Sequence, residues 1–416
     1  MSRRVADRPE DAPGVRRQAG DLELARRHAP VIHFDLAEPF LPDLVGYAVV
    51  RRPGPSPTFD RYLDLRIPGG GRAEAVIEYA LWYDWDIQHL YELEHAWAYL
   101  GAAGELVHAE GSWHGEPIPL LRDGRVSSEA GRPVAYAQPG KHALSADPLL
   151  FAAHDGYREL VRREAEDRAG GGLLTGGLVA GALRASARRN SLIRAYLHTR
   201  AFAPTFRFER RWDGADANLV SIEELAEAAP RRLRAELARL ASDRDRRRIW
   251  AVLLDLGDTL MDETSEEKDP TETTQRAELF PGAADVVRWL RRSGYLVGLV
   301  ADTRPGSARN VLRQHGIFEM FDTLVISEEL GTSKPDPAMF LAAFRAFGLR
   351  RSETDRVVMV GNRLDRDIRG ANALGIVSVL VRHNDRYPAE SSDPGDQPTH
   401  TIAAISELET LLRRLG

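Results

Sequence analysis

The chain has 416 residues, which is enough for two or three domains that each bury a core of their own. Its formal net charge of -6 gives no sign of a general affinity for nucleic acid, and the absence of cysteine excludes disulfides, thiolate metal sites and a cysteine nucleophile. No apolar run is long enough to span a membrane, and the charged residues 1–20 lack the apolar core of a signal peptide. We therefore expect a cytoplasmic protein that begins with a disordered arm over residues 1–23, and the oligomeric state stays open.

The first domain is expected over residues 24–240, and its residues 24–70 contain short apolar stretches that prolines interrupt, a pattern that favours strands over long helices. The aromatic runs 79–83 and 95–100 are typical of strands. Further short strands are expected near 105–109, 132–137 and 202–212. This first domain is therefore predicted to be β-rich and sandwich-like.

The densest group of acidic and histidine side chains lies between Tyr83 and His95. On a strand, Glu92 and Glu94 project from the same face, because side chains alternate with a period of two. His89 lies in the approach to this strand and is expected to reach the same pocket. One imidazole and two carboxylates suit a divalent cation, which makes His89, Glu92 and Glu94 candidate ligands. The alternative is an exposed strand edge on which the histidine stands by chance.

The spacing His-x-x-Glu-x-Glu from His89 to Glu94 resembles the His-x-x-Asp-x-Glu core of the heptapeptide Gly-His-Arg-His-Asp-Trp-Glu in necrosis-inducing microbial toxins. It also resembles related vacuolar-sorting-protein-like β-domains. The resemblance extends over residues 24–220, where the segments 112–115 and 133–143 are similar to later parts of those families. The membrane-lytic role of the secreted toxins is not implied, because this chain has neither cysteine nor a signal sequence.

Residues 221–248 are expected to form a helix between two domains, with Ser221 and Glu224 as a capping box and the domain boundary near residue 240. The second domain, 246–416, alternates apolar strand runs with helical runs. The expected strands are 251–254, 296–301, 323–326, 356–360 and 376–381, and the expected helices are 283–292, 306–315, 336–347, 366–373 and 403–414. Such alternation predicts an α/β fold with a doubly wound, mostly parallel sheet.

Four stretches of the second domain place polar residues after strands or in turns. They are Ala251–Leu260 with Asp255, Leu296–Thr303 with Asp302 and Thr303, Gly331–Pro337 with Lys334, and the run Gly-Asn-Arg-Leu-Asp-Arg-Asp-Ile-Arg-Gly-Ala from Gly361 to Ala371. Ligands of open α/β sheets bind beyond the carboxyl ends of the strands. Together these stretches resemble the four motifs of the haloacid dehalogenase-like hydrolase superfamily over residues 246–416.

This resemblance implies hydrolysis of a phosphomonoester through an aspartyl-phosphate. Asp255 matches the nucleophile, and Lys334 matches the lysine that pairs with the nucleophile and with the substrate phosphate. A carboxylate is a workable nucleophile when positive charges neutralise the phosphoryl oxygens. Lysine is informative here because the chain has only three lysines, Lys141, Lys268 and Lys334, among its 56 basic residues. An ammonium acts as a compact point charge, unlike the planar guanidinium.

The resemblance also implies a magnesium ion, for which the matching ligands are Asp255, the carbonyl of Gly257, Asn362 and Asp367. The residues that match substrate contacts are Asp302, Thr303 and Lys334. The intervals between the motifs leave no room for a large cap domain, so that we expect a capless enzyme. Its substrate is expected to be a phosphorylated small molecule or a larger phosphorylated substrate.

Three positions depart from the family pattern. Gly257 stands where the family has a general acid, and Asp258 is the candidate replacement. Ala301 replaces a Ser or Thr, although the hydroxyl of Thr303 is close by, and Asn362 replaces an acidic metal ligand. Two alternatives therefore stay open. The second domain is either a working phosphatase or a degenerate module that binds a phosphate or a partner without turnover, with any activity residing in the N-terminal metal site.

Overall fold

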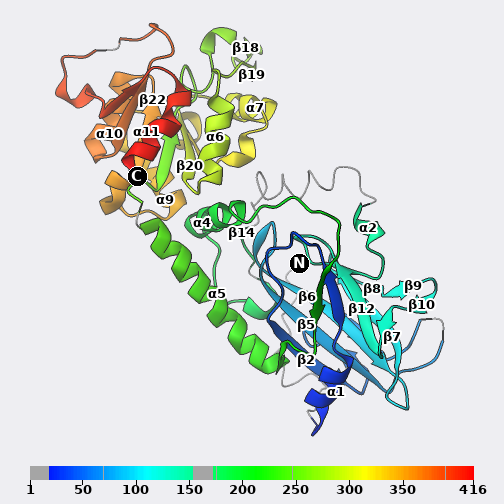
Figure 1. The fold of residues 1–416 in the computed structure, drawn as a ribbon. Helices are drawn as coiled ribbons and strands as arrows, with labels where there is room; N and C mark the ends of the chain where they lie inside the picture. Colours follow the sequence, from blue (N-terminus) through cyan, green and yellow to red (C-terminus); the bar gives the residue numbers. More distant parts are fainter. Residues whose placement is uncertain (1–17, 69, 153–171, 175, 246, 389) are drawn as a thin grey trace. The chain divides into compact units, whose positions relative to one another are not determined.

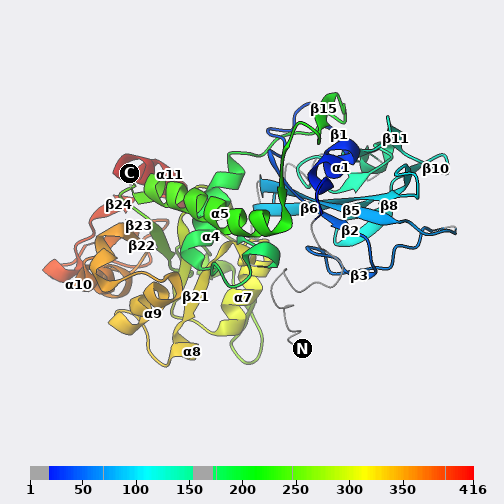
Figure 2. The ribbon, with the colours of Figure 1, turned by 90° about the horizontal axis from the view of Figure 1, so that it is seen from below.

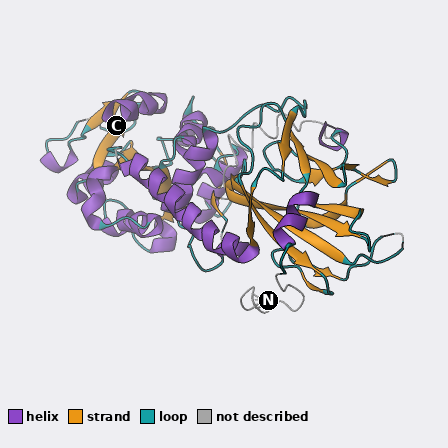
Figure 3. Cartoon of the chain, turned by 60° about the horizontal axis from the view of Figure 1, so that its bottom comes forward, coloured by secondary structure: helices purple, strands orange, loops and turns teal. Residues whose placement is uncertain are grey.

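The computed structural model describes residues 18–68, 70–152, 172–174, 176–245, 247–388 and 390–416. The chain divides into two compact units: Met1–Arg184 with Leu197–Leu237, and Ala185–Tyr196 with Ala238–Gly416. One unit consists mainly of strands, and the other combines strands with many helices (Figure 3). The domain limits 24–240 and 246–416 remain a proposal. The second unit differs from them because it also includes the segment 185–196. The arm predicted over residues 1–23 lies largely outside the described residues.

The first unit is built on two sheets, which Figure 2 shows as separate layers. The larger sheet has the strand order β16-β2-β5-β6-β7-β8, with β14 paired to β6, and the smaller sheet has the order β11-β12-β1-β15, with β13 paired to β12. The larger sheet comprises β2 (Leu44–Val50), β5 (Ala75–Trp85), β6 (His89–Leu100), β7 (Leu106–Trp113), β8 (Glu116–Pro119), β14 (Gly172–Leu173) and β16 (Asn218–Ser221). The smaller comprises β1 (Val31–Phe34), β11 (Ser128–Glu129), β12 (Arg132–Ala137), β13 (Leu144–Ser145) and β15 (Arg210–Asp213).

Short elements surround these sheets. They are α1 (Asp21–His28), the strand pairs β3 (Gly54–Pro55) with β4 (Tyr62–Leu63) and β9 (Leu121–Arg122) with β10 (Arg125–Val126), α2 (Leu149–Ala152) and the 3₁₀ helix η2 (Gly177–Val179). Side chains from both sheets meet in one buried cluster, which includes Tyr79 and Leu81 of β5, Ala96 of β6 and Phe34 of β1. Two facing sheets with one core between them are the arrangement of a β-sandwich. The prediction of a β-rich first domain is confirmed.

The strand predicted over 202–212 is shorter than expected, because β15 begins only at Arg210. Residues 202–209 instead form a loop around the buried carboxylate of Asp35. This carboxylate accepts hydrogen bonds from the backbone amides of Thr205 and Phe206, and Phe206 adopts a positive φ of 55°. Backbone amides that bond a side chain are not available to a strand ladder, which explains why this prediction was wrong.

The second unit contains a sheet of six parallel strands in the order β21-β20-β17-β22-β23-β24. The strands are β17 (Ala251–Leu254), β20 (Leu296–Ala301), β21 (Thr323–Ile326), β22 (Val357–Gly361), β23 (Val377–Val381) and β24 (His400–Ile402). A separate hairpin joins β18 (Glu267–Lys268) to β19 (Thr274–Arg276). All four residues of β17 are buried, as is typical of an interior parallel strand. The predicted strands 296–301 and 323–326 coincide with β20 and β21.

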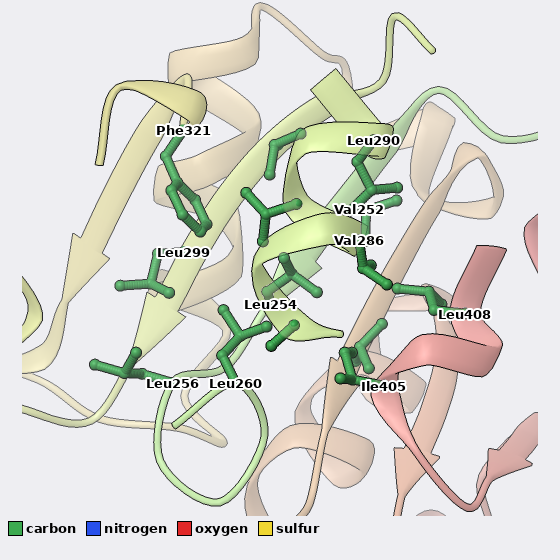
Figure 4. Packing of buried hydrophobic residues seen from close by; sticks show 14 of the residues in the cluster. Val252, Leu254, Leu256, Leu260, Val286, Leu290, Leu299, Phe321, Ile405 and Leu408 are labelled. Atoms are coloured by element: carbon green, nitrogen blue, oxygen red, sulfur yellow. The ribbon is translucent and has the colours of Figure 1, made fainter. Parts of the chain in front are cut away.

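Helices cover both faces of this sheet. They are α6 (Ala283–Arg292), α7 (Pro305–Gln314), α8 (Ser327–Leu330), α9 (Pro337–Phe347), α10 (Arg369–Leu374) and α11 (Leu408–Leu415). One face carries α6, α7 and α11, and Figure 4 shows Val286 and Leu290 of α6 packed close to Val252 and Leu254 of β17. The other face carries α9 and α10. The prediction of a doubly wound parallel sheet is confirmed, and Figure 1 shows this alternation of strands and helices.

Two further helices are α4 (Ala187–His198), which precedes β15 in the chain, and α5 (Ile222–Asp245), which follows β16 and precedes β17. The capping box predicted at the start of α5 is confirmed. The amide of Ser221 donates to Glu224 Oε2 at 2.8 Å, and the amide of Glu224 donates to Ser221 Oγ at 3.2 Å. In the part of the chain that the structure describes, no helix is both long enough and apolar enough to cross a membrane.

The buried His95 predicts how the stability of the first unit depends on pH. Burial lowers the pKa of His95 to about 3, whereas the pKa of histidine in an unfolded chain is about 6.5. Below pH 6.5 the unfolded chain therefore binds a proton that the folded chain does not bind. As the pH falls from 6.5 to 3, His95 should therefore lower the free energy of unfolding by on the order of 4 kcal/mol. Urea unfolding at several pH values should show a flatter pH profile for His95→Gln than for the wild type, and parallel profiles would contradict this assignment.

Candidate active site

The sequence-predicted residues of the second unit meet at one edge of its sheet. Asp255 follows β17, while Asp302 and Asn362 follow the two strands β20 and β22 that pair with β17. The carboxyl ends of adjacent parallel strands lie side by side, which brings these residues together. They line a cavity of about 110 Å³. Of the predicted residues, the cavity lining includes Asp255, Gly257, Asp302, Thr303, Lys334 and Asn362.

A buried ammonium lies between two carboxylates of this site. Lys334 Nζ is 2.5 Å from Asp255 Oδ1 and 2.7 Å from Asp367 Oδ1, and only 2% of the Lys334 side chain is exposed. Burial by itself lowers the pKa of Lys334, but the nearby charges of Asp255 and Asp367 outweigh it and raise this pKa. Burial also raises the pKa of Asp367, against the opposing effect of Lys334. The ammonium therefore stays charged and compensates the carboxylates.

Asp302 holds the turn that carries the lysine. Its Oδ1 accepts a hydrogen bond from the backbone amide of Lys334 at 3.0 Å, and its Oδ2 lies 3.3 Å from Arg366 Nη1. The sequence predicted a substrate contact for Asp302, and these bonds add a positioning task. Thr303 lines the cavity with its neighbour, as predicted from its place after β20.

Asp367 reaches the site because Gly361 has no side chain. A Cβ at position 361 would overlap the carboxylate of Asp367. Asp367 lies in the π-helical segment η6 (Leu364–Ile368). The amide of Arg363 donates to Asp367 Oδ2 at 3.0 Å and holds the carboxylate against the end of β22. Its Oδ1 lies 2.7 Å from the Lys334 ammonium. The buried carboxylate therefore joins the lysine to the end of β22.

Asp258 lies outside the lining of the cavity that holds Asp255. Its Oδ1 accepts a hydrogen bond from the amide of Glu263 at 3.1 Å, and its Oδ2 lies 3.0 Å from Arg386 Nη1. Only 1% of the residue is exposed. These contacts hold the loop after β17 in shape, and the proton-transfer role that the sequence predicted for Asp258 stays a prediction.

Several residues that line the cavity were not predicted from the sequence. They are Glu263, Glu266, Arg363, Arg366 and Tyr387. The two arginines lie inside the motif from Gly361 to Ala371, and their spacing could have drawn attention to them. Glu263 stands in a polar stretch without any motif. Burial and the charge of Asp258 raise the pKa of Glu263, against the opposing effect of Arg386.

The donor atoms at this edge of the sheet fit a magnesium ion. Three of the predicted ligands line the cavity: Asp255, Gly257 and Asn362. Asp367 adds a buried carboxylate, which also contacts the Lys334 ammonium. Carboxylate, carbonyl and amide oxygens are the donors that this hard cation prefers. The set is less acidic than one with a carboxylate at position 362.

A second group of possible ligands lies in the first unit, where ligand atoms of Asp86, His89 and Glu92 all lie within 4.8 Å of one another. His89 stands between the two carboxylates, with Nδ1 3.2 Å from Asp86 Oδ1 and Nε2 3.6 Å from Glu92 Oε2. Asp86 is fully buried and also contacts the ammonium of Lys141. The sequence predicted His89 and Glu92 for this group but did not single out Asp86.

Glu94, the third predicted ligand, is not part of this group. It is buried and accepts a hydrogen bond from Ser112 Oγ of the neighbouring strand β7. Burial and the charge of Glu92 raise the pKa of Glu94 well above its usual value. The chain turns between Asp86 and His89, since Asp86 Oδ1 accepts the amides of Gln88 and His89 at 2.7 Å. This turn brings Asp86 to His89, and a pattern that assumes a regular strand does not contain it.

The chain resembles known proteins over part of its length. The family model for haloacid dehalogenase-like hydrolases matches residues 155–375. A glyceraldehyde 3-phosphate phosphatase from Methanopyrus kandleri is 35% identical over 137 residues, which are 33% of this chain and 58% of that protein. A phosphoglycolate phosphatase from Nitrosococcus oceani is 27% identical, with 34% and 60% covered. A phosphoserine phosphatase from Thermus thermophilus is 31% identical, with 32% and 51% covered.

The match spans less than two thirds of each of these three relatives. Among solved structures, a HAD phosphatase from Thermococcus onnurineus is 19% identical, with 39% of this chain and 98% of that chain covered and a TM-score of 0.33.

Loss of the buried ammonium should destabilise the second unit. Lys334→Met leaves Asp255 and Asp367 buried without a compensating cation, which should cost about 3–5 kcal/mol. Lys268→Met is the matched control, because Lys268 is 41% exposed and pairs with Glu266 at the surface, where loss of a pair costs less than about 1 kcal/mol. Urea unfolding should separate the two variants. The double variant Asp255→Asn with Lys334→Met should recover part of the loss, and an additive double variant would contradict the ion triad.

Proposed function

Because the chain belongs to the haloacid dehalogenase-like hydrolase family, we propose that its second unit hydrolyses phosphomonoesters through an aspartyl-phosphate at Asp255. The observation that carries this proposal is the pair of Asp255 and Lys334 in the cavity at the carboxyl end of β17. A carboxylate held by an ammonium, with further positive charge for the phosphoryl oxygens, is an arrangement suited to nucleophilic attack on phosphorus.

The side chains divide the work as follows. Asp255 attacks phosphorus with one carboxylate oxygen, while Lys334 orients the nucleophile and neutralises charge on the phosphoryl group. Asp302 keeps the lysine turn in place through its bond to the Lys334 amide. Asp255, the carbonyl of Gly257, Asn362 and Asp367 would hold a magnesium ion, which when bound supplies positive charge to the phosphoryl oxygens. Thr303 offers a hydroxyl to the substrate.

The proposed substrate is a small phosphorylated molecule. The printed names of the relatives describe phosphatases of glyceraldehyde 3-phosphate, phosphoglycolate and phosphoserine, all of which are small phosphate esters. In the second unit, the segment between β17 and α6 holds the 3₁₀ turn η3 (Glu263–Ser265) and the two-stranded hairpin β18–β19 rather than a cap domain. An open cavity also admits a larger phosphorylated substrate, and a substrate panel distinguishes the two.

Replacement of the nucleophile should abolish turnover. An amide cannot form the phosphorylated intermediate, so that Asp255→Asn should lower kcat by about 10⁴-fold or more while the variant stays folded. Asp258→Asn should lose less activity, because the side chain of Asp258 lies outside the cavity lining. The measurement is phosphate release from a panel of phosphate esters with magnesium, together with thermal melting of each variant. Near-wild-type activity of Asp255→Asn would contradict the assignment.

The same panel also tests the alternative of a module that binds phosphate without turnover. A wild type that binds inorganic phosphate but releases none from any ester would support that alternative. The departures at Gly257, Ala301 and Asn362 are the sequence features that favour it.

We also propose that the first unit binds a divalent cation at His89 and Glu92, with Asp86 as the third ligand. Glu94, which bonds Ser112, is not one of these three ligands. The supporting observation is the close approach of ligand atoms from the first three residues. Lys141 competes with a cation, because its ammonium contacts Asp86. The resemblance to the toxin-like β-domains stays a prediction.

Binding of a cation to the first unit can be measured by difference. Wild-type protein should bind one more zinc ion per chain than Glu92→Gln, and zinc should raise the melting temperature of the first unit by mass action. Lys141→Met should bind zinc more tightly than the wild type, because Asp86 then loses its competing cation. Glu105→Gln removes a glutamate from a loop of the same unit and serves as the control. Equal stoichiometry for wild type and Glu92→Gln would rule out this site.

A further inference from the structure

Transfer of a phosphoryl group from an alkyl ester to Asp255 needs more than a nucleophile. The leaving alkoxide is strongly basic and must receive a proton, and the water that later cleaves the aspartyl-phosphate must lose one. A side chain that performs both steps has to lie next to the nucleophile and carry a proton-exchanging group. At position 257, two residues after Asp255, the chain has a glycine and therefore no such group.

The space beside Gly257 is filled by another carboxyl group. A Cβ built on Gly257 would overlap Oε1 of Glu263 and would lie only 3.0 Å from its Cδ. Gly257 has no positive φ, so that its backbone would accept a side chain. Oε1 of Glu263 thus occupies the space into which a side chain at position 257 would begin to extend. Glu263 and Asp255 line the same cavity.

The loop after β17 holds Glu263 in this position. The amide of Glu263 donates to Asp258 Oδ1 at 3.1 Å, which fixes the start of η3. Arg386 Nη1 lies 2.9 Å from Glu263 Oε2 and 3.0 Å from Asp258 Oδ2. These contacts use Oε2 and leave Oε1 as the oxygen beside Gly257. The carboxyl is therefore anchored through one oxygen and presents the other to the cavity.

The carboxyl groups of Asp258, Asp302 and Glu266 are committed to other partners. Asp258 binds Arg386 and the Glu263 amide, and Asp302 binds the Lys334 amide and Arg366. Glu266 accepts a hydrogen bond from Thr274 Oγ1 at 2.7 Å and pairs with Lys268. None of these three carboxylates is the group that fills the space at Gly257.

We propose that Glu263 is the catalytic proton donor and acceptor of the phosphoryl transfer at Asp255, an inference that rests on the proposed function. In the first step a bond forms between Asp255 and phosphorus, the ester P–O bond breaks, and the Glu263 proton goes to the leaving oxygen. In the second step Glu263 takes a proton from water as the water oxygen bonds to phosphorus. The bond between phosphorus and Asp255 then breaks, and phosphate leaves with both side chains regenerated.

The test compares two phosphate esters that differ in their need for a proton. Nitrophenolate leaves without protonation, whereas an alkoxide does not. For full-length Glu263→Gln, kcat/KM for phosphoglycolate should fall by about 100-fold or more, while kcat/KM for 4-nitrophenyl phosphate changes little. Because the second step also slows, 4-nitrophenyl phosphate should give a burst of one nitrophenolate per chain and a phosphorylated protein that mass spectrometry detects. The burst itself shows that the variant is folded.

Two further variants complete the test. Glu267→Gln removes an exposed carboxylate of β18 that does not line the cavity, and should show neither the selective loss nor the burst. The double variant Gly257→Asp with Glu263→Ala moves the carboxyl to position 257 and should restore hydrolysis of phosphoglycolate relative to Glu263→Ala. Equal losses on both esters, or no loss on either, would overturn the role of Glu263. A wild type that hydrolyses neither ester would instead overturn the proposed function.

Discussion

The site of the second unit depends on one buried ammonium. Asp255 and Asp367 reach the same place from the ends of two neighbouring strands, and two carboxylates cannot be buried side by side in their charged form without a cation. Lys334 supplies the cation at 2.5 and 2.7 Å. Asp302, from a third strand, binds the backbone of the lysine. The ends of β17, β20 and β22 are therefore tied together by charge at the point where the sheet can bind a ligand.

Two glycines give this arrangement its room. Gly361 ends β22, and its missing side chain lets the Asp367 carboxylate fold back against the strand. Gly257 does the same for Glu263 after β17. In each case the chain contributes a carboxyl group from a few residues further along rather than from the position itself. The glycine at or after the strand end provides the space, and a residue six positions later provides the carboxyl group. The role of each carboxyl group therefore depends on the glycine that it packs against.

The sequence predicted the parts of the molecule that depend on local patterns. Buried parallel strands appear as continuous apolar runs, and for this reason the limits of β20 and β21 coincide with the predicted ones. The residues after β17, β20 and β22 line one cavity because parallel strands end at the same edge. The capping box of α5 involves two residues three positions apart and is equally local.

Contacts between distant residues were not predictable in this way. Glu263 is held by Arg386, which is 123 positions away in the chain, and no local pattern connects the two. Asp35 organises the loop at Thr205 from 170 positions away and cancels the expected strand there. In the first unit, Ser112 of β7 binds Glu94 from 18 positions away. Each of these differences comes from a side chain that bonds backbone or side-chain groups across the fold.

The three lysines of the chain show what kind of charge these sites require. Lys334 is 2% exposed between two carboxylates, and Lys141 is 15% exposed against the buried Asp86. Lys268, at 41% exposure, pairs with Glu266, which itself lines the cavity of the second unit. Arginine fills the other 53 basic positions. An ammonium is compact and fits between closely spaced oxygens, whereas a guanidinium needs a planar, two-pronged partner. The chain thus uses lysine at acidic clusters that require a small cation. A divalent metal ion is also small and positively charged, so that it suits the same clusters.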